Sequence, residues 1–416
     1  MASSNALITD EALSRARLRL GIPEKSRRMP FNEYATLDTI RHYAYGFGDD
    51  NPLWSNPVYA TSSPWGEVIA PPMYPISAGV PEPVTWTSEQ SEAMSGGDPL
   101  KGIGQYLRAE RWHFAGPITV GTRLTRRRAL VKAERTEPSS FAGGHRGAVM
   151  CWRMVYSDER DPEHPVAVNE REFFYTERDT APTANRRDEV AHYDADALQA
   201  IDDLYEAETR RGIRTRTKSD VNVGDQLGTI VRGPLTITDV MAHHVGTGLG
   251  GAYGVGPLRL GYLNRRHVPG FYSKNEQGVP DVVQRCHWEN AWAQDLGHPS
   301  AYDYGMMRMT WLSHLVTDWM GDGATMLSFE GSARKFNYVG DTQWMSGTVE
   351  NIVEVTNGTT VYLVLEGKNQ DDEVTCRGAV TVLLPLSVDG AAKAAPLEES
   401  LFSFDRDALG ASEEER

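Results

Sequence analysis

The chain has 416 residues, of which 40% are hydrophobic and 24% are charged, so it has enough apolar side chains to bury a core. Its length suits two or three domains, or one duplicated unit. A formal net charge of -15 argues against broad nucleic-acid binding, which needs a basic surface. Three scattered cysteines without CxxC spacing favour neither a disulfide framework nor a structural zinc site. We therefore expect a cytoplasmic protein that has no membrane span, bound metal or other cofactor.

In chain order, the sequence of the first half predicts a helix, an irregular loop rich in Pro and Gly, and then strands. A polar amphipathic helix pattern extends to about Leu20, and the Asn-Pro and Pro-Pro pairs that follow break regular structure. From about Arg108 the pattern favours strands, at Arg123–Glu134, Ala148–Ser157 and Val166–Thr176. A polar stretch over 180–188 and a helix candidate at Asp194–Arg211 then predict a linker between two halves.

The second half repeats this order, which indicates an α+β fold with an internal duplication. A strand is predicted at Val221–Arg232, and a late series is predicted at Glu330–Asn337, Thr342–Val355, Thr359–Lys368 and Glu373–Leu384, with Asn357-Gly358 as a hairpin turn. Val-Gly pairs at 120–121, 223–224 and 339–340 each introduce a strand. We predict domains over 1–180 and 219–390, a linker region over 181–218 and an acidic tail over 391–416.

One loop of the first half has a distinctive motif, Gly48-Asp49-Asp50-Asn51-Pro52-Leu53-Trp54-Ser55-Asn56-Pro57-Val58-Tyr59-Ala60. With Gly66–Pro72 it resembles the MaoC-like (R)-specific enoyl-CoA hydratase and acyl dehydratase family in its two-hotdog, FAS1-like dehydratase form. That family's signature is G-D-x-N-P-[LI]-H-x-D-x-x-[YF]-A. The resemblance implies a double hotdog, in which each domain is a central helix wrapped by an antiparallel sheet. It also implies a lyase of fatty acid metabolism that adds water to, or removes it from, an acyl-CoA or acyl-carrier thioester.

The two halves divide the family's catalytic residues between them. Asp49 and Asn51 match its catalytic Asp and the neighbouring Asn, but Trp54 stands in place of its catalytic His. In the second half, His287-Trp288-Glu289-Asn290-Ala291-Trp292-Ala293 matches the later part of the signature and aligns His287 with Trp54. We therefore predict that His287 is the principal acid/base.

The acidic partner of His287 is less defined. The position five residues before it is Val282, and the candidate acids are Asp281, Glu289 and Asp303. General acid–base groups would activate water and protonate the α-carbon, while the amides at the start of the central helix would hold the thioester oxygen. The predicted substrate-binding residues are Trp54, Glu289, Trp292, Tyr302, Asp303, Tyr304 and Gly305.

Structural interpretations compete with several of these assignments. Asp49 and Asn51 can cap a turn, and His287 can be a packed histidine. His243 and His244 lie on a helix-like run as surface or packing residues. His314 and Asp318 have the i, i+4 spacing of metal ligands, but no third ligand is evident, and an apolar run around His314 favours a core helix. A site that combines Asp49 with His287 is disfavoured, because a pseudo-two-fold axis would place their loops in separate sites.

Two further patterns complete the sequence. Gly246–Gly251 fits GxGxxG, but a helix-like run precedes it where a dinucleotide site needs a strand, so we interpret it as a loop within an insertion from Gly246 to about Arg285. Basic clusters at 126–128, 210–218 and 265–266 could hold coenzyme A phosphates or form solvated faces. Two other functions stay open: a repurposed hotdog enzyme acting on a secondary metabolite, and a non-catalytic acyl-CoA-binding subunit of a hetero-complex. We expect a homodimer.

Overall fold

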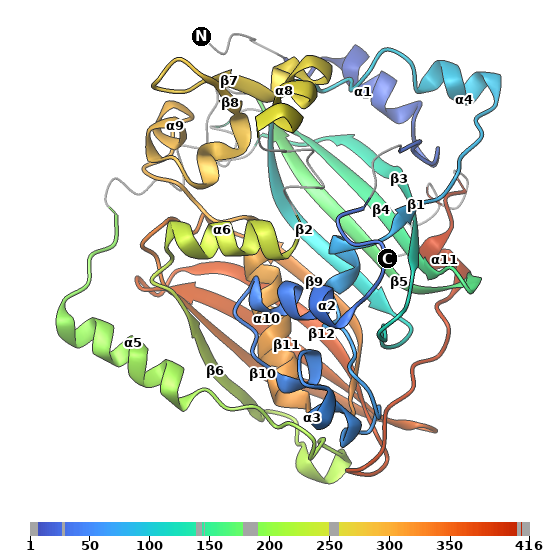
Figure 1. Cartoon of the computed structure of the whole chain (residues 1–416), viewed down its shortest axis with the longest axis vertical. Coiled ribbons are helices and arrows are strands. Elements are labelled where there is room, and N and C mark those ends of the chain that lie inside the picture. The colour runs from blue at the N-terminus through green and yellow to red at the C-terminus, as the bar shows by residue number, and fades with distance from the viewer. Residues whose placement is uncertain are drawn as a thin grey trace.

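Ten strands form one continuous sheet through both halves of the chain (Figure 1). The computed structural model describes residues 7–26, 30–138, 144, 146–177, 190–248, 258–405 and 409. The strand order is β1-β3-β4-β5-β2-β9-β12-β11-β10-β6, and β7 pairs with β8 in a separate ribbon. The strands are β1 Val80–Pro81, β2 Gly104–Phe114, β3 Leu124–Arg135, β4 Ala148–Asp158, β5 Asp161–Thr176, β6 Gln226–Arg232, β7 Tyr272–Lys274, β8 Pro280–Val282, β9 Thr325–Ala333, β10 Gln343–Val355, β11 Gly358–Asn369 and β12 Val374–Leu384.

The sheet is nearly palindromic about the junction of β2 and β9. The order β3-β4-β5-β2 on one side mirrors β9-β12-β11-β10 on the other. β2 and β9 pair antiparallel, from Ala109 opposite Ser332 to His113 opposite Ser328. Each half therefore closes the open edge of the other half's sheet. Together with the helices on one face, this pseudo-symmetric sheet is the α+β double hotdog that the sequence predicts.

Most helices lie on one face of the sheet or at its ends (Figure 1). They are α1 Asp10–Arg17, α2 Leu37–Tyr45, α3 Pro57–Thr61, α4 Ser88–Ala93, α5 Ala195–Ala207, α6 Ile237–Gly246, α8 Leu258–His267, α9 Asn290–Asp295, α10 Gly305–Met320 and α11 Glu399–Phe402. Short 3-10 turns are η1 Pro52–Trp54, η2 Tyr74–Ser77, η5 Lys218–Asp220, η6 Pro269–Phe271 and η7 Val283–His287. None of the described helices combines the length and the apolar character that a membrane crossing requires.

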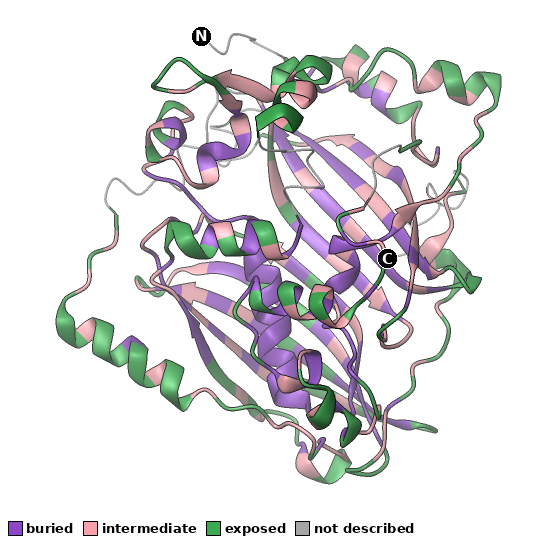
Figure 2. Cartoon of the chain, viewed as in Figure 1, coloured by how far each residue is buried: buried purple, intermediate pink, exposed green. Residues whose placement is uncertain are grey.

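The central helix of the second half, α10, is buried on all sides. Every residue of α10 after Gly305 is buried, and Figure 2 shows the helix in purple through the middle of the molecule. An amphipathic surface helix would leave one polar face in water, whereas α10 is apolar nearly all round because it lies between the sheet and the loops of the first half. Its polar residues, including Arg308, His314 and Asp318, are therefore buried too.

The first half has no matching long helix among the described residues, which corrects the expectation of one central helix in each domain. The alignment of Trp54 with His287 places Pro72 opposite Gly305, the first residue of α10. From there the first half forms only the η2 turn and strand β1. Pro75, Pro81 and Pro83 explain the difference, since proline lacks an amide hydrogen and clashes with the preceding helical turn.

Helices α2 and α6 are equivalent elements of the two halves. Thr36 and Thr236 each cap their helix in a reciprocal capping box, and the two residues are 200 positions apart. Gly46 and Gly246, also 200 apart, pack backbone against backbone, because a Cβ built on Gly246 would lie 2.6 Å from the Cα of Gly46. This contact places both glycines close to the pseudo-two-fold axis.

The element predictions are largely confirmed. The three strands of the first half, the hairpin turn before Gly358, the linker helix and the second strand series all form, although β9 begins before its predicted start at Glu330. The offset between the halves grows from 200 at α2 and α6 to 233 at Trp54 and His287, so the second half has about 33 extra residues. α8, η6, β7 and β8 lie in this insertion. Residues 181–189 of the predicted linker, 249–251 of the GxGxxG pattern and 410–416 of the tail lie outside the described residues.

Candidate functional site

His287 lies at the end of η7, beside the start of α10. Its Nδ1 is 2.9 Å from the carbonyl oxygen of Tyr302. A carbonyl can only accept, so Nδ1 bears the proton and Nε2 has the lone pair. The ring packs on Tyr304 with centroids 3.9 Å apart and contacts the Tyr302 ring at 4.9 Å. Burial lowers the pKa of His287 to about 4, against the raising influence of the Tyr302 carbonyl and Asp303, so the ring is neutral near pH 7.

Tyr304 connects this histidine to helix α6. The Nε2 of Gln284 donates to the Tyr304 hydroxyl at 3.0 Å, and the same hydroxyl lies 2.8 Å from Nδ1 of His244. The hydroxyl accepts from Gln284, and the tautomer of His244 determines which of the two groups donates in the second hydrogen bond. His287, Tyr304, His244 and Gln284 are called the helix-start cluster below. They come from η7, the N-cap of α10 and helix α6.

The three acids predicted as partners of His287 have other contacts. The Asp303 carboxylate binds Arg308, with Nε 2.8 Å from Oδ2, and accepts from Asn337 at 3.2 Å. Arg308 also donates to the carbonyls of Lys335 and Thr375, so Asp303 fastens the start of α10 to the sheet. Its charge still favours protonation of His287, through space.

Asp281 and Glu289 lie in the insertion and on the next turn. Asp281 accepts a hydrogen bond from its neighbour's amide at Val282, at 2.7 Å. Glu289 forms an ion pair with the buried Arg285 at 2.8 Å. Neither makes a described contact with His287. The titratable side chain that packs on the His287 ring is therefore the phenol of Tyr304 and not a carboxylate.

The remaining predicted binding residues have clear local contacts. Trp292 donates its indole hydrogen to the Val283 carbonyl at 2.8 Å and packs under Arg285, 4.2 Å from ring centroid to guanidinium carbon. Tyr302 donates its hydroxyl to Cys286 at 3.4 Å. Gly305 begins α10 and packs closely on Leu107 of β2. Tyr302 and Gly305 border the helix-start cluster. The indole N–H of Trp292, in contrast, is hydrogen-bonded within the η7–α9 region.

In the first half, the Asp49 loop is closed on itself. Asp49 accepts from the backbone amide of Asn51 at 2.9 Å and from the indole of Trp54 at 2.8 Å. Asn51 accepts from the amide of Leu53 at 3.0 Å. Trp54 thus stands in place of the family's histidine and donates its indole hydrogen to the Asp49 carboxylate. An indole N–H is a hydrogen-bond donor only, so Trp54 cannot act as an acid or a base. These contacts fit the turn-capping interpretation of both residues.

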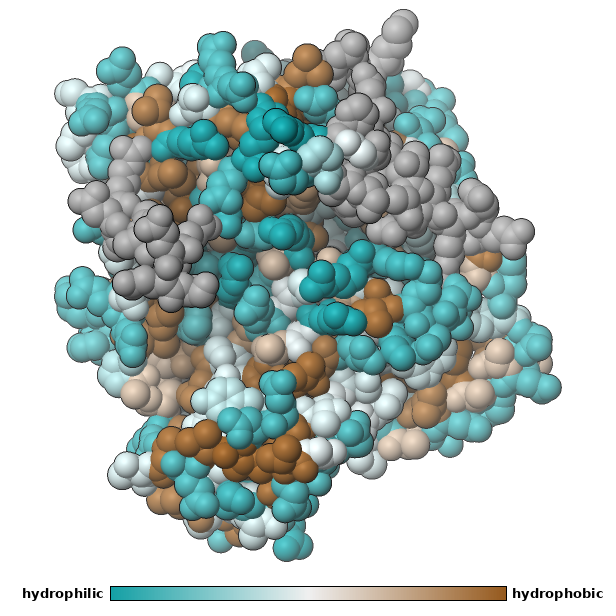
Figure 3. Space-filling model, turned by 180° about the vertical axis from the view of Figure 1, so that it is seen from behind, coloured by the Kyte–Doolittle hydropathy of each residue, from teal (hydrophilic) through white to brown (hydrophobic). Residues whose placement is uncertain are grey.

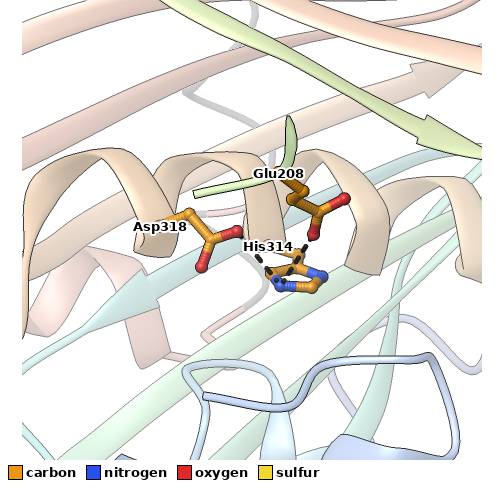
Figure 4. Close-up of side chains that lie close together, drawn as sticks. All are labelled: Glu208, His314 and Asp318. Atoms are coloured by element: carbon orange, nitrogen blue, oxygen red, sulfur yellow. Dashed lines mark ion pairs between the residues drawn. The ribbon is translucent and has the colours of Figure 1, made fainter. Parts of the chain in front are cut away.

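The structure brings Asp49 to His314 of α10 and gives no contact between Asp49 and His287. His314 Nε2 lies 3.5 Å from Asp49, 3.3 Å from Asp318 and 4.0 Å from Glu208. Figure 4 shows His314 between the Glu208 and Asp318 carboxylates. Asp49, Glu208, Arg232, His314 and Asp318 are called the inter-half cluster below. Glu208 is the third acidic neighbour that the sequence did not reveal.

The inter-half cluster has metal-ligand geometry but the wrong protonation for it. The ligand atoms of Glu208, His314 and Asp318 lie within 4.8 Å of one another. However, an NH2 nitrogen of Arg232 is 2.8 Å from His314 Nδ1, and a guanidinium can only donate. Nδ1 must therefore accept, which leaves the proton of the neutral ring on Nε2. A protonated nitrogen facing the carboxylates does not coordinate a metal, so this geometry favours a cluster held by charge attraction, in which Nε2 forms no hydrogen bond with a described residue.

Burial sets the charges of the inter-half cluster. It raises the pKa of Asp318 to about 8, assisted by the charges of Asp49 and Glu208, and raises the pKa of Asp49 to about 6. Burial and the nearby Arg232 lower the pKa of His314 to about 3. Near pH 7 Asp318 is then protonated, and the Asp49 and Glu208 carboxylates balance the guanidinium groups of Arg232 and the nearby Arg210.

The larger cavity lies beside the first-half motif. It contains about 590 Å³ of space including its mouth, and its lining includes Asn51, Trp54, Pro72, Thr317 and Asp322. Because Trp54 and Pro72 are the counterparts of His287 and Gly305, this cavity is the first-half equivalent of the helix-start cluster. It has a tryptophan and a proline where the second half has a base and a helix start.

Sequence reasoning missed several of these residues. His243 and His244 are buried, as the packing alternative predicted, but the hydrogen bond between His244 and Tyr304 was not predicted. The matching capping boxes at Thr36 and Thr236 could have aligned α2 with α6 and placed both histidines on the buried face. No sequence signal could have paired Asp49 with His314, because their contact depends on how the two halves pack.

Comparisons with known proteins agree with this architecture. Residues 30–151 match the family model of the FAS1-like, dehydratase domain region. A solved structure described as a MaoC-like dehydratase superimposes with a TM-score of 0.58 and 15% identity, covering 88% of this chain and 98% of that chain. No curated protein sequence matches the chain.

Two further solved structures align over similar lengths. A conserved hypothetical protein from Mycobacterium tuberculosis, described as having a double hotdog fold, aligns with 12% identity and a TM-score of 0.49, over 86% of this chain and 97% of that chain. A MaoC-like dehydratase from Phytophthora capsici gives 11% identity and a TM-score of 0.47, over 88% and 97%. Both TM-scores are below 0.5, so the fold assignment depends on the first structure and on the sheet order.

The strand order and the likeness to the first solved structure define the fold class of the protein, an α+β double hotdog. More particularly, the region of its first half that matches the FAS1-like, dehydratase domain model, residues 30–151, contains the motif between Gly48 and Ala60.

Proposed function

We propose that the chain is a hydratase/dehydratase that adds water to, or removes it from, the α,β double bond of an acyl thioester, and that the second half performs the chemistry. The observation that supports this most strongly is the geometry of His287. Its Nδ1–H is held by the Tyr302 carbonyl, so the basic Nε2 is available at the start of α10. A neutral, oriented imidazole next to a helix N-terminus meets two requirements of thioester hydration.

In the hydration direction, His287 Nε2 takes a proton from water as the water oxygen bonds to the β-carbon. The electron pair of the double bond moves toward the thioester carbonyl, whose oxygen becomes an enolate. The backbone amides of Gly305 and Met306 have no intrahelical acceptor, being the first of α10, and would stabilise this oxygen. The proton on His287 then passes to the α-carbon, which restores the neutral ring and gives a 3-hydroxyacyl thioester.

Tyr304 takes the place that an acid partner has in the family. Its ring packs on His287, and its hydroxyl is fixed by Gln284 and His244. We assign Tyr304 a positioning role: it holds the His287 ring in one orientation and keeps the helix start dry. Asp303 supports the same geometry through Arg308.

The carrier is proposed to be held by the insertion. Arg265 and Arg266 on α8 form no ion pair with a described carboxylate and pack instead on Tyr262. In contrast, Arg128 and Arg211 of the other two basic clusters pair with Glu24 and Asp220. Coenzyme A and acyl carrier protein both present phosphate groups, which guanidinium groups bind well.

The insertion is also tied to the catalytic loop. Asn264 of α8 donates to the Tyr272 hydroxyl of β7 at 2.8 Å, and Arg285 of η7 donates to Ser273 at 2.9 Å and to the Lys274 carbonyl at 3.2 Å. Phosphates bound at α8 would therefore be held in a fixed relation to His287.

A homodimer remains part of the proposal. Polar residues cover much of the back face in Figure 3, with apolar residues gathered near its lower end. The exposed apolar side chains of strands β10 and β11 include Val353, Tyr362 and Val364. Light scattering on the purified chain gives the oligomeric state.

The direct test is the hydration of a graded series of 2-enoyl-CoA thioesters, followed by the loss of absorbance of the conjugated double bond. We expect turnover whose kcat/KM falls on the acid side with a midpoint near the pKa of His287, about 4, and is level through neutral pH. Below this pKa the ring is protonated and cannot accept the proton of water. Absence of turnover with every chain length would contradict the proposal and favour a binding subunit or different chemistry.

A further inference from the structure

A second cavity lies between the two halves, where α2 faces α6. It contains about 250 Å³ of space including its mouth, with room inside for a group about the size of one water molecule, and both Tyr43 of α2 and His243 of α6 line it. These two residues occupy equivalent positions, each seven residues after the N-cap threonine of its helix. The cavity thus lies close to the pseudo-two-fold axis, with one polar ring from each half facing it.

The polar atoms that face this cavity have no partners. Tyr43 is fully buried and His243 is 1% exposed. The Tyr43 hydroxyl and both ring nitrogens of His243 form no hydrogen bond with any described residue. Buried polar groups are nearly always paired, since an unpaired one loses its hydration without compensation. Three unpaired atoms around one cavity therefore indicate an occupant that has a polar atom of its own.

Charge restricts the occupant to an uncharged group. Glu110 and Arg171 also line the cavity, but they neutralise each other, with the Nε and an NH2 nitrogen of Arg171 both 2.9 Å from the same Glu110 oxygen. Burial lowers the pKa of His243 to about 3, so its ring is neutral, with one donor and one acceptor nitrogen. A carboxylate or ammonium group would enter this cavity without a counter-ion, which is costly.

The cavity lies one ring beyond the helix-start cluster. Tyr304 is in ring contact with His287 at 3.9 Å and with His243 at 6.0 Å. Met306 and Thr310, from the first turns of α10, also line the cavity. The cavity is therefore separated from His287 by the Tyr304 ring alone.

We propose that this cavity binds a hydroxyl or keto oxygen on the acyl group of the substrate, by hydrogen bonds from the Tyr43 hydroxyl and the His243 ring. The inference depends on the proposed thioester chemistry and adds the class of acyl group. A plain hydrocarbon chain has no polar atom to place there and would leave all three polar atoms unpaired, so the enzyme would discriminate against it.

The test compares 2-enoyl-CoA substrates that differ only in the distal end of the chain: unsubstituted, hydroxylated and keto, each over a graded series of lengths. For one chain length we expect the wild-type protein to prefer an oxygenated substrate by about tenfold or more in kcat/KM. Tyr43→Phe and His243→Phe should reduce this preference by at least about tenfold, while the unsubstituted substrate changes much less. The matched control is Tyr45→Phe, because Tyr45 lies on the same helix and is 55% exposed.

The outcomes separate the two proposals. Turnover of plain and oxygenated substrates at equal efficiency by the wild-type protein would overturn this inference, leave the proposed function intact and show that the cavity holds only water. A preference that survives both substitutions would overturn it as well, by placing the recognition elsewhere. Absence of turnover with all thioesters would remove the proposed function, and this inference with it. The wild-type comparison needs no variant, so it decides the matter even if a variant does not fold.

Discussion

Replacing Asp318 with asparagine should remove most of the pH dependence of stability between about pH 6 and pH 8. Burial raises the pKa of Asp318 to about 8 in the folded chain, assisted by the charges of Asp49 and Glu208 and opposed by Arg210 and Arg232. The unfolded value is about 3.9. Between these values the folded chain holds one proton more than the unfolded chain. Stability is therefore greatest at low pH within this window and falls as the pH rises toward 8.

The magnitude follows from that one proton. A difference of one bound proton changes the free energy of unfolding by about 1.4 kcal/mol per pH unit. Asp49 shares the same pocket and has a pKa of about 6, so the two carboxyl groups release their protons as a coupled pair. We therefore expect the wild-type protein to lose about 2–3 kcal/mol between pH 6 and 8 that the Asp318→Asn variant does not lose.

Urea unfolding at several pH values measures this difference, with Asp202→Asn on the exposed face of α5 as the matched control. The control should follow the wild-type curve. A variant at Asp318 with the same pH slope as the wild type would refute the protonation that we assign to the inter-half cluster. It would also reopen the question of a metal ion there, since three ionised carboxylates would then surround His314.

Two further predictions concern the packing of the halves. Trp54→Phe removes the indole hydrogen bond to Asp49 at 2.8 Å, so we expect the free energy of unfolding, measured by thermal unfolding, to fall by about 1–2 kcal/mol. The variant should keep its hydratase activity. Loss of turnover in a folded variant would place chemistry in the first half. Gly246→Ala introduces a Cβ 2.6 Å from the Cα of Gly46, so we expect a loss of at least about 1–3 kcal/mol by calorimetry; a neutral effect would show that α2 and α6 can separate without cost.

The sequence predicts the parts of the fold that depend on local pattern. Alternating apolar residues revealed the strands of both halves, and the run from Trp311 to Trp319 revealed the buried central helix. The missing helix of the first half had a visible signal, in Pro75 and the prolines that follow it. An internal duplication predicts the same element in both halves, and the prolines of the first half override that expectation.

In the candidate site, too, the sequence predicts what depends on local pattern and does not predict the contacts between distant residues. His287 was predicted from the later part of the motif, His287 to Ala293, and it lies beside the start of α10. His244, which binds Tyr304, and Asp49 and Glu208, which lie beside His314, come from other elements, and these contacts were not predicted. A contact between residues that are far apart in the chain depends on how the halves pack, and one sequence without relatives has no signal for it.

The account's central claim is that the chemistry belongs to the second half. The measurement that tests it most directly is the rate of 2-enoyl-CoA hydration by His287→Gln beside Asp49→Asn, with His267→Gln on the exposed part of α8 as the matched histidine control. Glutamine can still donate to the Tyr302 carbonyl but cannot act as a base, so we expect kcat to fall by about 10²–10⁴-fold, while the other two variants retain most of their activity. Loss of activity in Asp49→Asn, with activity kept in His287→Gln, would contradict the account and move the active site to the first half.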